Sequence, residues 1–252
     1  MTTKPWKAAL IGLLAFGALA NAAPAPAKAC YVIDARGQKH EGIELRLVSP
    51  GGDLELNVDG RARLPFKAGA YRAAMIPRPQ EVAVLEKAFQ DGQHEAVVKN
   101  AAGLFDKYKF LGWGGPIAHL EGQALLQTGK PQDALKAFAK GRQFPGEVGD
   151  DLTRGIVSAL VDMKDTEQVQ PMLNAMMASS RKQDAAFAFA SRGRMLEHAN
   201  KDKEAVLEYL KVLLFFEDSS AVSGIREDAR GRAVALLKKM NDGRWKQVET
   251  LK

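Results

Sequence analysis

The spacing of apolar residues divides most of the chain into two parts. Between residues 30 and 76, apolar residues occupy every second position, whereas from residue 80 to residue 252 they recur at intervals of three and four. A period of two places one face of a β-strand against a core, and a period near 3.6 does the same for a helix. We therefore expect a small β module over residues 30–76 and a helical domain over residues 80–252.

Four short antiparallel strands are expected in the β module. The alternation is found at residues 31–35, 43–47, 54–58 and 62–66. The dipeptide Asp59-Gly60 separates the last two runs and predicts a tight type I′ hairpin. Because about 45 residues can bury only a thin core, we expect the module either to close as a small SH3-like barrel or to dock its open face onto the helical domain.

The helical domain shows an internal repeat. Its 173 residues (252 − 80 + 1) correspond to five units of about 35 residues, a period typical of stacked helical hairpins. Two of the units carry a glycine, an alanine and an aromatic residue at identical spacings of 12 and 4 residues. These are Gly122, Ala134 and Phe138 in one unit and Gly193, Ala205 and Tyr209 in the other.

The two triads resemble the tetratricopeptide repeat (TPR), whose helices approach closely at small residues and whose aromatic residue fills the gap to the next unit. Residues 82–108, 150–180 and 226–252 each read as a further helical pair. The chain departs from the repeat at Glu121 and Arg192, where the repeat usually has an apolar residue. The resemblance implies a mainly α fold, a TPR-like α-solenoid of about five helical hairpins preceded by the small antiparallel β module.

The resemblance also implies where a partner would bind. In a TPR array, fixed positions of each first helix line a concave groove that holds an extended peptide or a partner helix. The corresponding residues here are polar and mixed in charge. They are His119, Gln123 and Gln127 in one unit, Asp151, Arg154 and Ser158 in the next, and Arg194, Glu197 and His198 in the third. On this basis Arg194→Glu is expected to weaken partner binding without lowering thermal stability.

Residues 1–22 have the three-part pattern of a bacterial secretory signal peptide. The cations Lys4 and Lys7 precede an uncharged run over residues 8–20, and a small-x-small site ends at Ala22. The uncharged run of 13 residues (20 − 8 + 1) is short for a bilayer core of about 30 Å. We expect cleavage after Ala22 and a periplasmic or extracellular protein. Membrane contact is expected only through this segment if it is left uncleaved.

The stretch that follows the signal peptide is an extended Pro/Ala linker over residues 23–29. Cys30 comes directly after it. A lipoprotein signal needs an aliphatic residue where Ala27 stands and a small residue where Lys28 stands, so we expect no lipid anchor at Cys30. A single cysteine also excludes an intramolecular disulfide framework and a cysteine-cluster zinc site.

The charge balance gives no indication of nucleic-acid binding. There are 36 basic residues against 30 acidic ones, so the net charge is +6, and removing Lys4 and Lys7 with the signal peptide lowers it to +4. The run of cations around Arg226, Arg230 and Arg232 is interspersed with acids, which fits either a solvated helix face or an anionic contact. A small net charge on an exported protein argues against nucleic acid as its partner.

Residue patterns that carry chemistry are missing from the sequence. The four histidines (His40, His94, His119 and His198) include no pair four residues apart, as a metalloprotease helix requires. The chain has no G-x-S-x-G motif, and the glycines of residues 112–116 lack the Lys-Ser/Thr of a P-loop. We therefore predict no catalytic residue, no metal site and no cofactor, and we expect that the protein is not an enzyme.

The leading hypothesis is an exported protein-protein interaction scaffold that binds a peptide or a partner helix in the concave groove. One alternative is a structural or assembly component of the cell envelope that acts by self-association. A second alternative is a hydrolase whose catalytic pattern is not recognisable in the sequence. The sequence leaves the oligomeric state and the identity of the protein or peptide partner open.

Overall fold

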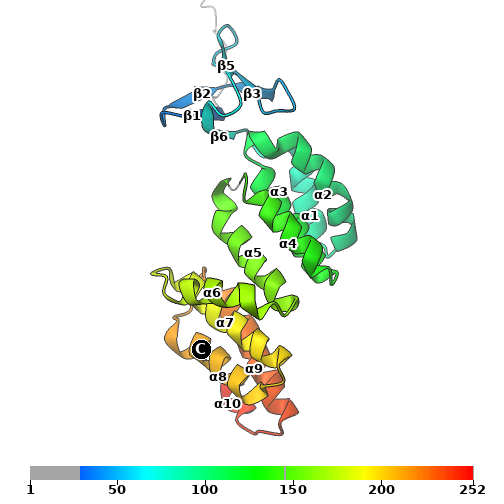
Figure 1. Ribbon diagram of the computed structural model, residues 1–252, viewed down its shortest axis with the longest axis vertical. Helices are drawn as coiled ribbons and strands as arrows, with labels where there is room; N and C mark the ends of the chain where they lie inside the picture. The colour runs from blue at the N-terminus through cyan, green and yellow to red at the C-terminus, as the bar shows by residue number, and fades with distance from the viewer. Residues whose placement is uncertain (1–28, 145, 252) are drawn as a thin grey trace, which may run out of the picture.

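The computed structural model describes residues 29–144 and 146–251. The predicted signal peptide (1–22) and nearly all of the predicted linker (23–29) lie outside these residues. Figure 1 shows an elongated molecule, with the β region at one end and the helices stacked away from it in chain order. The fold is mainly α, as the sequence predicts.

Six strands, and not four, make up the β region. They are β1 (Cys30–Asp34), β2 (Lys39–Gly42), β3 (Glu44–Leu47), β4 (Leu54–Asn57), β5 (Arg63–Phe66) and β6 (Tyr71–Met75). They form two three-stranded antiparallel sheets, in the orders β2-β1-β6 and β3-β4-β5. The expected four-stranded meander is therefore wrong. The sequence pattern missed β2 and β6, because β2 carries polar side chains and only Ala74 of β6 is fully buried.

The hairpin between β4 and β5 is present, but its turn is not of type I′. A type I′ turn needs positive φ at both central residues, whereas here only Gly60 has one, at 90°. The Asp59 carboxylate accepts hydrogen bonds from the backbone N–H groups of Arg61 and Ala62, at 2.9 and 2.8 Å. This side-chain cap stabilises a longer loop, which the dipeptide alone does not reveal.

The β region docks onto the first helices, the second of the two arrangements expected from the sequence. The Trp113 indole N–H donates to the Ile76 carbonyl at 3.1 Å, and the Ile76 N–H donates to the Leu111 carbonyl at 3.2 Å. One continuous core extends from the strands, at Val32, to the helices, at Phe105. The described strand ladders do not join the two sheets into a closed barrel.

The helices pack sequentially in pairs. They are α1 (Gln80–Gln90), α2 (His94–Tyr108), α3 (Gly114–Gln127), α4 (Pro131–Gly141), α5 (Gly149–Asp162), α6 (Thr166–Met177), α7 (Lys182–His198), α8 (Asp202–Phe215), α9 (Ser223–Lys239) and α10 (Trp245–Glu249). Each helix contacts the next one, and each odd-numbered helix also contacts the next odd-numbered helix. This arrangement of stacked hairpins confirms the fold class predicted from the periodicity.

Every one of these pairs turns through a single left-handed residue. These residues are Gly92, Gly129, Lys164, Asn200 and Asn241, with φ between 53° and 74°. Each turn has the same two backbone hydrogen bonds. In the second pair, for example, Gly129 N–H donates to Leu126 and Lys130 N–H donates to Leu125, a Schellman motif. The repeated geometry shows that the units are equivalent at the turn, including those without the full sequence triad.

The predicted packing triads lie where the helices approach most closely. Phe138 of α4 and Tyr209 of α8 are completely buried. A Cβ atom placed on Gly122 would lie 2.4 Å from the Phe138 ring, and one placed on Gly193 would lie 2.5 Å from the Tyr209 ring. Ala134 and Ala205 are also fully buried beside these rings. The ring therefore occupies the volume that the glycine leaves free.

A second glycine contacts Phe138 from the following hairpin. A Cβ atom on Gly155 of α5 would lie 2.5 Å from the same ring. Phe138 is thus held between Gly122 of its own unit and Gly155 of the next, which links the two units. The sequence pattern does not mark Gly155 as a packing position, because the unit that contains it has no alanine and aromatic residue at the matching spacings.

We predict that Gly155→Ala lowers the free energy of unfolding by about 1–3 kcal/mol, because the added methyl group overpacks the core around Phe138. The control is Gly231→Ala in α9, where a Cβ atom meets nothing within 4 Å. That substitution should stabilise the protein by about 0.5–1 kcal/mol through helix propensity. Chemical denaturation of both variants measures the difference, and equal effects of the same sign would contradict this packing.

Candidate functional site

The nine residues that the TPR resemblance assigns to a groove lie on α3, α5 and α7. These three odd-numbered helices contact one another along the stack and can be followed down the centre of Figure 1. In such a stack, the first helix of each pair forms the inner face. These nine residues together are called the inner face.

On α3, three inner-face residues are spaced four apart. His119 and Gln123 are half-buried, with their Nε2 atoms 3.4 Å apart, and Gln127 is exposed at the helix end. Burial lowers the pKa of His119, an effect that the positive charge of Arg154 reinforces and the negative charge of Asp151 opposes. His119 therefore presents a neutral imidazole to the inner face near neutral pH.

On α5, Arg154 connects two helices. Its guanidinium donates to the Asp151 carboxylate on the same helix at 2.5 Å and to the Asp184 carboxylate on α7 at 2.7 Å. Asp184 is only 2% exposed and also pairs with Arg181 at 2.6 Å. A buried carboxylate without cationic partners would be strongly destabilising, and of its two partners it is Arg154 that links Asp184 to α5.

The far end of α5 has a second connection to α7. The Arg194 guanidinium lies 2.5 Å from the Asp162 carboxylate, and His198 Nδ1 lies 3.1 Å from the Val161 carbonyl oxygen. Both contacts hold the C-terminal end of α5 against α7. Arg194 therefore has a structural role, and the expectation that Arg194→Glu would leave thermal stability unchanged has to be revised.

Glu197 joins α7 to α8 and α9. It accepts a hydrogen bond from the Tyr209 hydroxyl, which comes from α8, and it lies 3.4 Å from the Arg232 guanidinium of α9. Burial, together with this bond to Glu197, raises the pKa of Tyr209. The phenol thus remains neutral and donates a hydrogen bond to the Glu197 carboxylate.

Several inner-face residues therefore bond to neighbouring helices. Four of them, Arg154, Arg194, Glu197 and His198, bridge between helices. Within the part of the chain that the structure describes, the side chains of Gln127 and Ser158 form no hydrogen bond, and those of His119 and Gln123 hydrogen-bond only to each other. The stretch between α3 and α5 is consequently where amide, hydroxyl and imidazole groups are available to a ligand.

Other residues singled out in the sequence have structural positions. Arg226 is 3% exposed and donates to the Leu213 carbonyl at 2.8 Å, so it caps the C-terminal end of α8 and is not on a solvated face. The methionines of α6 are structural as well, because Met176 is buried in the core and Met172 and Met177 pack against that core. Cys30 is buried in the β region, and burial raises the pKa of its thiol.

The described residues, 29–144 and 146–251, include no group of three or more His, Cys, Asp or Glu side chains placed to hold a metal ion. Within the same ranges, no helix has the length and apolar character needed to cross a membrane. No protein-family model matches the chain, and no curated protein or solved structure matches it. The TPR resemblance therefore rests on the packing triads and the paired helices.

We predict that Arg194→Glu lowers the free energy of unfolding by about 1–2 kcal/mol, because it places a carboxylate against Asp162 in a partly buried position. The charge-swapped double variant Arg194→Glu/Asp162→Arg should recover part of the loss. Lys99→Glu, on the exposed side of α2, serves as the control. Thermal and urea unfolding measure these chains, the wild type and the single variant Asp162→Arg. A double variant whose loss equals the sum of the two single losses would show that the pair does not interact.

We also predict that His119 titrates below its ordinary pKa of 6.5. As the pH falls, the unfolded chain binds a proton at this residue before the folded chain does, so the stability that the neutral imidazole supplies is lost on acidification. The NMR chemical shifts of the imidazole, followed between about pH 8 and pH 5, give the pKa directly. His119→Gln should reduce the fall in unfolding free energy over the same range.

Proposed function

We propose that the protein is an exported, non-enzymatic interaction scaffold that binds an extended peptide or a partner helix on the inner face of its helical stack. The observation that carries the proposal is the pair of polar rows on α3 and α5. The side chains of Gln123, Gln127 and Ser158 stand there between helices that are fixed relative to one another.

The surrounding ion pairs support this assignment. Arg154, Asp151 and Asp184 hold α5 against α7, and Phe138 is held between Gly122 of α3 and Gly155 of α5. A binding surface that is already fixed loses little conformational entropy when it binds a ligand. The amides offer both a donor and an acceptor, as the backbone of an extended peptide requires.

The signal-peptide pattern of residues 1–22 supports a partner outside the cytoplasm. The chemistry of the inner face indicates the class of that partner. It presents neutral amides, a hydroxyl and a neutral imidazole between α3 and α5, together with paired charges along α5 and α7. We therefore propose a protein or peptide partner that is recognised mainly through hydrogen bonds, with no nucleic acid involved.

We predict that the double variant Gln127→Lys/Ser158→Lys loses peptide binding and keeps its stability. Neither side chain has a hydrogen bond to lose, and substitutions of this kind usually change stability by less than about 0.5 kcal/mol. The two lysines would place long cationic side chains across the surface between α3 and α5 on which the peptide is proposed to bind. An immobilised library of random peptides, probed with the purified wild-type chain and with the variant, measures the effect.

The control is Gln132→Lys/Ala139→Lys on α4, where both side chains are exposed and lie outside the inner face. Peptides that bind wild type should bind this control as well, with an affinity changed by less than about threefold. The proposal is wrong if both variants bind the same peptides as wild type. It is equally wrong if the α4 variant, and not the inner-face variant, abolishes binding.

A further inference from the structure

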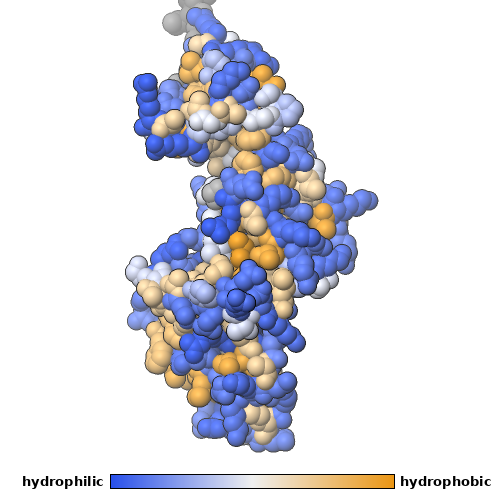
Figure 2. All heavy atoms as spheres, viewed as in Figure 1, coloured by the Kyte–Doolittle hydropathy of each residue, from blue (hydrophilic) through white to orange (hydrophobic). Residues whose placement is uncertain are grey.

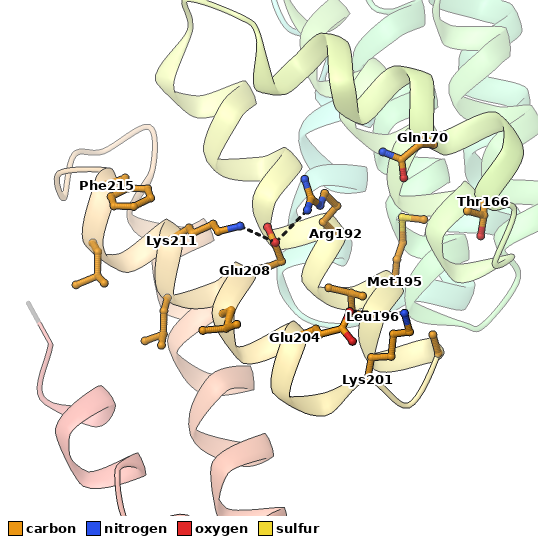
Figure 3. Close-up of a pocket in the computed structure, with 14 residues that line it drawn as sticks. Thr166, Gln170, Arg192, Met195, Leu196, Lys201, Glu204, Glu208, Lys211 and Phe215 are labelled. Carbon is orange, nitrogen blue, oxygen red and sulfur yellow. Dashed lines mark hydrogen bonds and ion pairs between the residues drawn. The ribbon is translucent and has the colours of Figure 1, made fainter.

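A second surface lies on α8, away from the inner face. A cavity of about 810 Å³ is bounded by α6, α7 and α8, and Figure 3 shows the side chains that line it. Met195 and Leu196 lie at one end of the cavity, near the start of α8, and Phe215 lies at the other. A neighbouring groove of about 790 Å³ follows the other side of the same helix, so α8 forms a ridge between two hollows.

The ridge is apolar and largely unpartnered. Leu207, Leu214 and Phe215 are 59%, 62% and 70% exposed, and Leu210 lies on the same side of the helix. Leucines at positions 207, 210 and 214 have the spacings of three and four that form the contact seam of a helix pair. The space-filling view shows apolar surface over the end of the molecule to which α8 belongs (Figure 2). Exposed apolar stripes of this kind mark interaction sites.

The floor of the cavity is held by a charge cluster. The carboxylate of Glu208, which is 5% exposed, lies 3.1 Å from Arg192 and 2.7 Å from Lys211, and all of these contacts use its Oε1 atom (Figure 3). Its Oε2 atom is buried without a hydrogen-bond partner. The cluster fixes Lys211 at the edge of the ridge, which gives that edge a defined positive charge.

The charges along the ridge are self-complementary. Glu204 and Lys211 are seven residues apart on the side of α8 that faces the cavity. If a second α8 lies antiparallel to the first, Glu204 of each helix falls opposite Lys211 of the other, because antiparallel helices pair equivalent flanking positions. A twofold axis near Leu207 produces both pairs at once.

The shape of the surface is also self-complementary. Leu214 and Phe215 project at the C-terminal end of α8, and the hollow lined by Met195, Leu196 and Ala199 lies beside its N-terminal end. The antiparallel arrangement places the projecting end of each copy over the hollow end of the other. α8 has 14 residues and is therefore about 21 Å long, which provides four turns of contact along the seam.

We propose that two copies of the protein associate through this surface, with their α8 helices antiparallel about a twofold axis. Leu207 lies near the axis, and Leu214 and Phe215 of each copy occupy the cavity of the other. Two Glu204–Lys211 pairs flank the seam and fix its register. The inner face stays open in this arrangement, so the dimer does not depend on the proposed peptide binding.

Analytical ultracentrifugation of the purified, exported chain tests the proposal. The wild type should sediment with about twice the mass of one chain. Leu214→Glu should raise the dimer dissociation constant by at least about tenfold, since it puts a charge into the apolar seam. Val84→Glu is the matched control, because Val84 on α1 is 59% exposed but far from the seam in the chain. A monomeric wild type, or a Leu214→Glu variant that dimerises like wild type, would overturn the proposal.

The charge pairs allow a mixing experiment that reports on the register. In Glu204→Lys, lysines face lysines across the twofold axis, and in Lys211→Glu, glutamates face glutamates. Each variant alone should be mostly monomeric, whereas an equimolar mixture should form heterodimers in which both flanking pairs are complementary again. Circular dichroism establishes whether Lys211→Glu is folded despite its proximity to Glu208. If it is not folded, the sedimentation of the single variants Glu204→Lys and Leu214→Glu, each measured alone, tests the interface. A mixture that stays monomeric would rule out the antiparallel register.

Discussion

The packing of an aromatic ring against glycine is the contact on which the helical stack depends. Phe138 has no exposed surface and lies between Gly122 and Gly155, two positions at which even a methyl group would overlap the ring. One hairpin cannot bury both of its apolar faces, so each unit needs the next. A ring shared between consecutive units supplies that connection, and Tyr209 repeats the ring–glycine contact against Gly193 further along the chain.

The sequence predicted the helices better than the strands, and the reason is physical. The apolar spacing of a helix repeats over ten or more residues, which makes it easy to recognise. A left-handed residue ends each first helix, so Gly92 and Gly129 are visible as breaks in the apolar pattern. Lys164 has the same left-handed conformation, but a lysine in the sequence does not indicate a turn. Strand β2 has four residues, most of them polar, and was missed because it is defined by its pairing with β1 and not by its own pattern.

The spacing of the repeat predicts that the inner-face residues lie on the first helices of their pairs, where the structure has them, but their contacts depend on the neighbouring helices. Nothing near Arg194 in the sequence indicates that Asp162, 32 positions earlier, would face it. The same holds for Arg154 and Asp184. In a solenoid, the positions that face a ligand are also those at which successive first helices meet, so a polar residue there can serve either purpose. Only the structure distinguishes the bridging residues from the available ones.

Because polar inner-face residues can either bridge helices or bind a ligand, the two proposed surfaces lie on different helices. The inner face is formed by α3, α5 and α7, and the apolar seam by α8. On the inner face, buried or half-buried charges hold the odd-numbered helices in register, which leaves amides and a hydroxyl for hydrogen bonds to a ligand. Along α8, the register is already secured by Tyr209 and by Arg226 at the helix end. Leu207 and Leu214 on its outward side are largely exposed, so their burial against another chain would add to stability. The stack thus fixes the geometry of both surfaces without requiring either to be occupied.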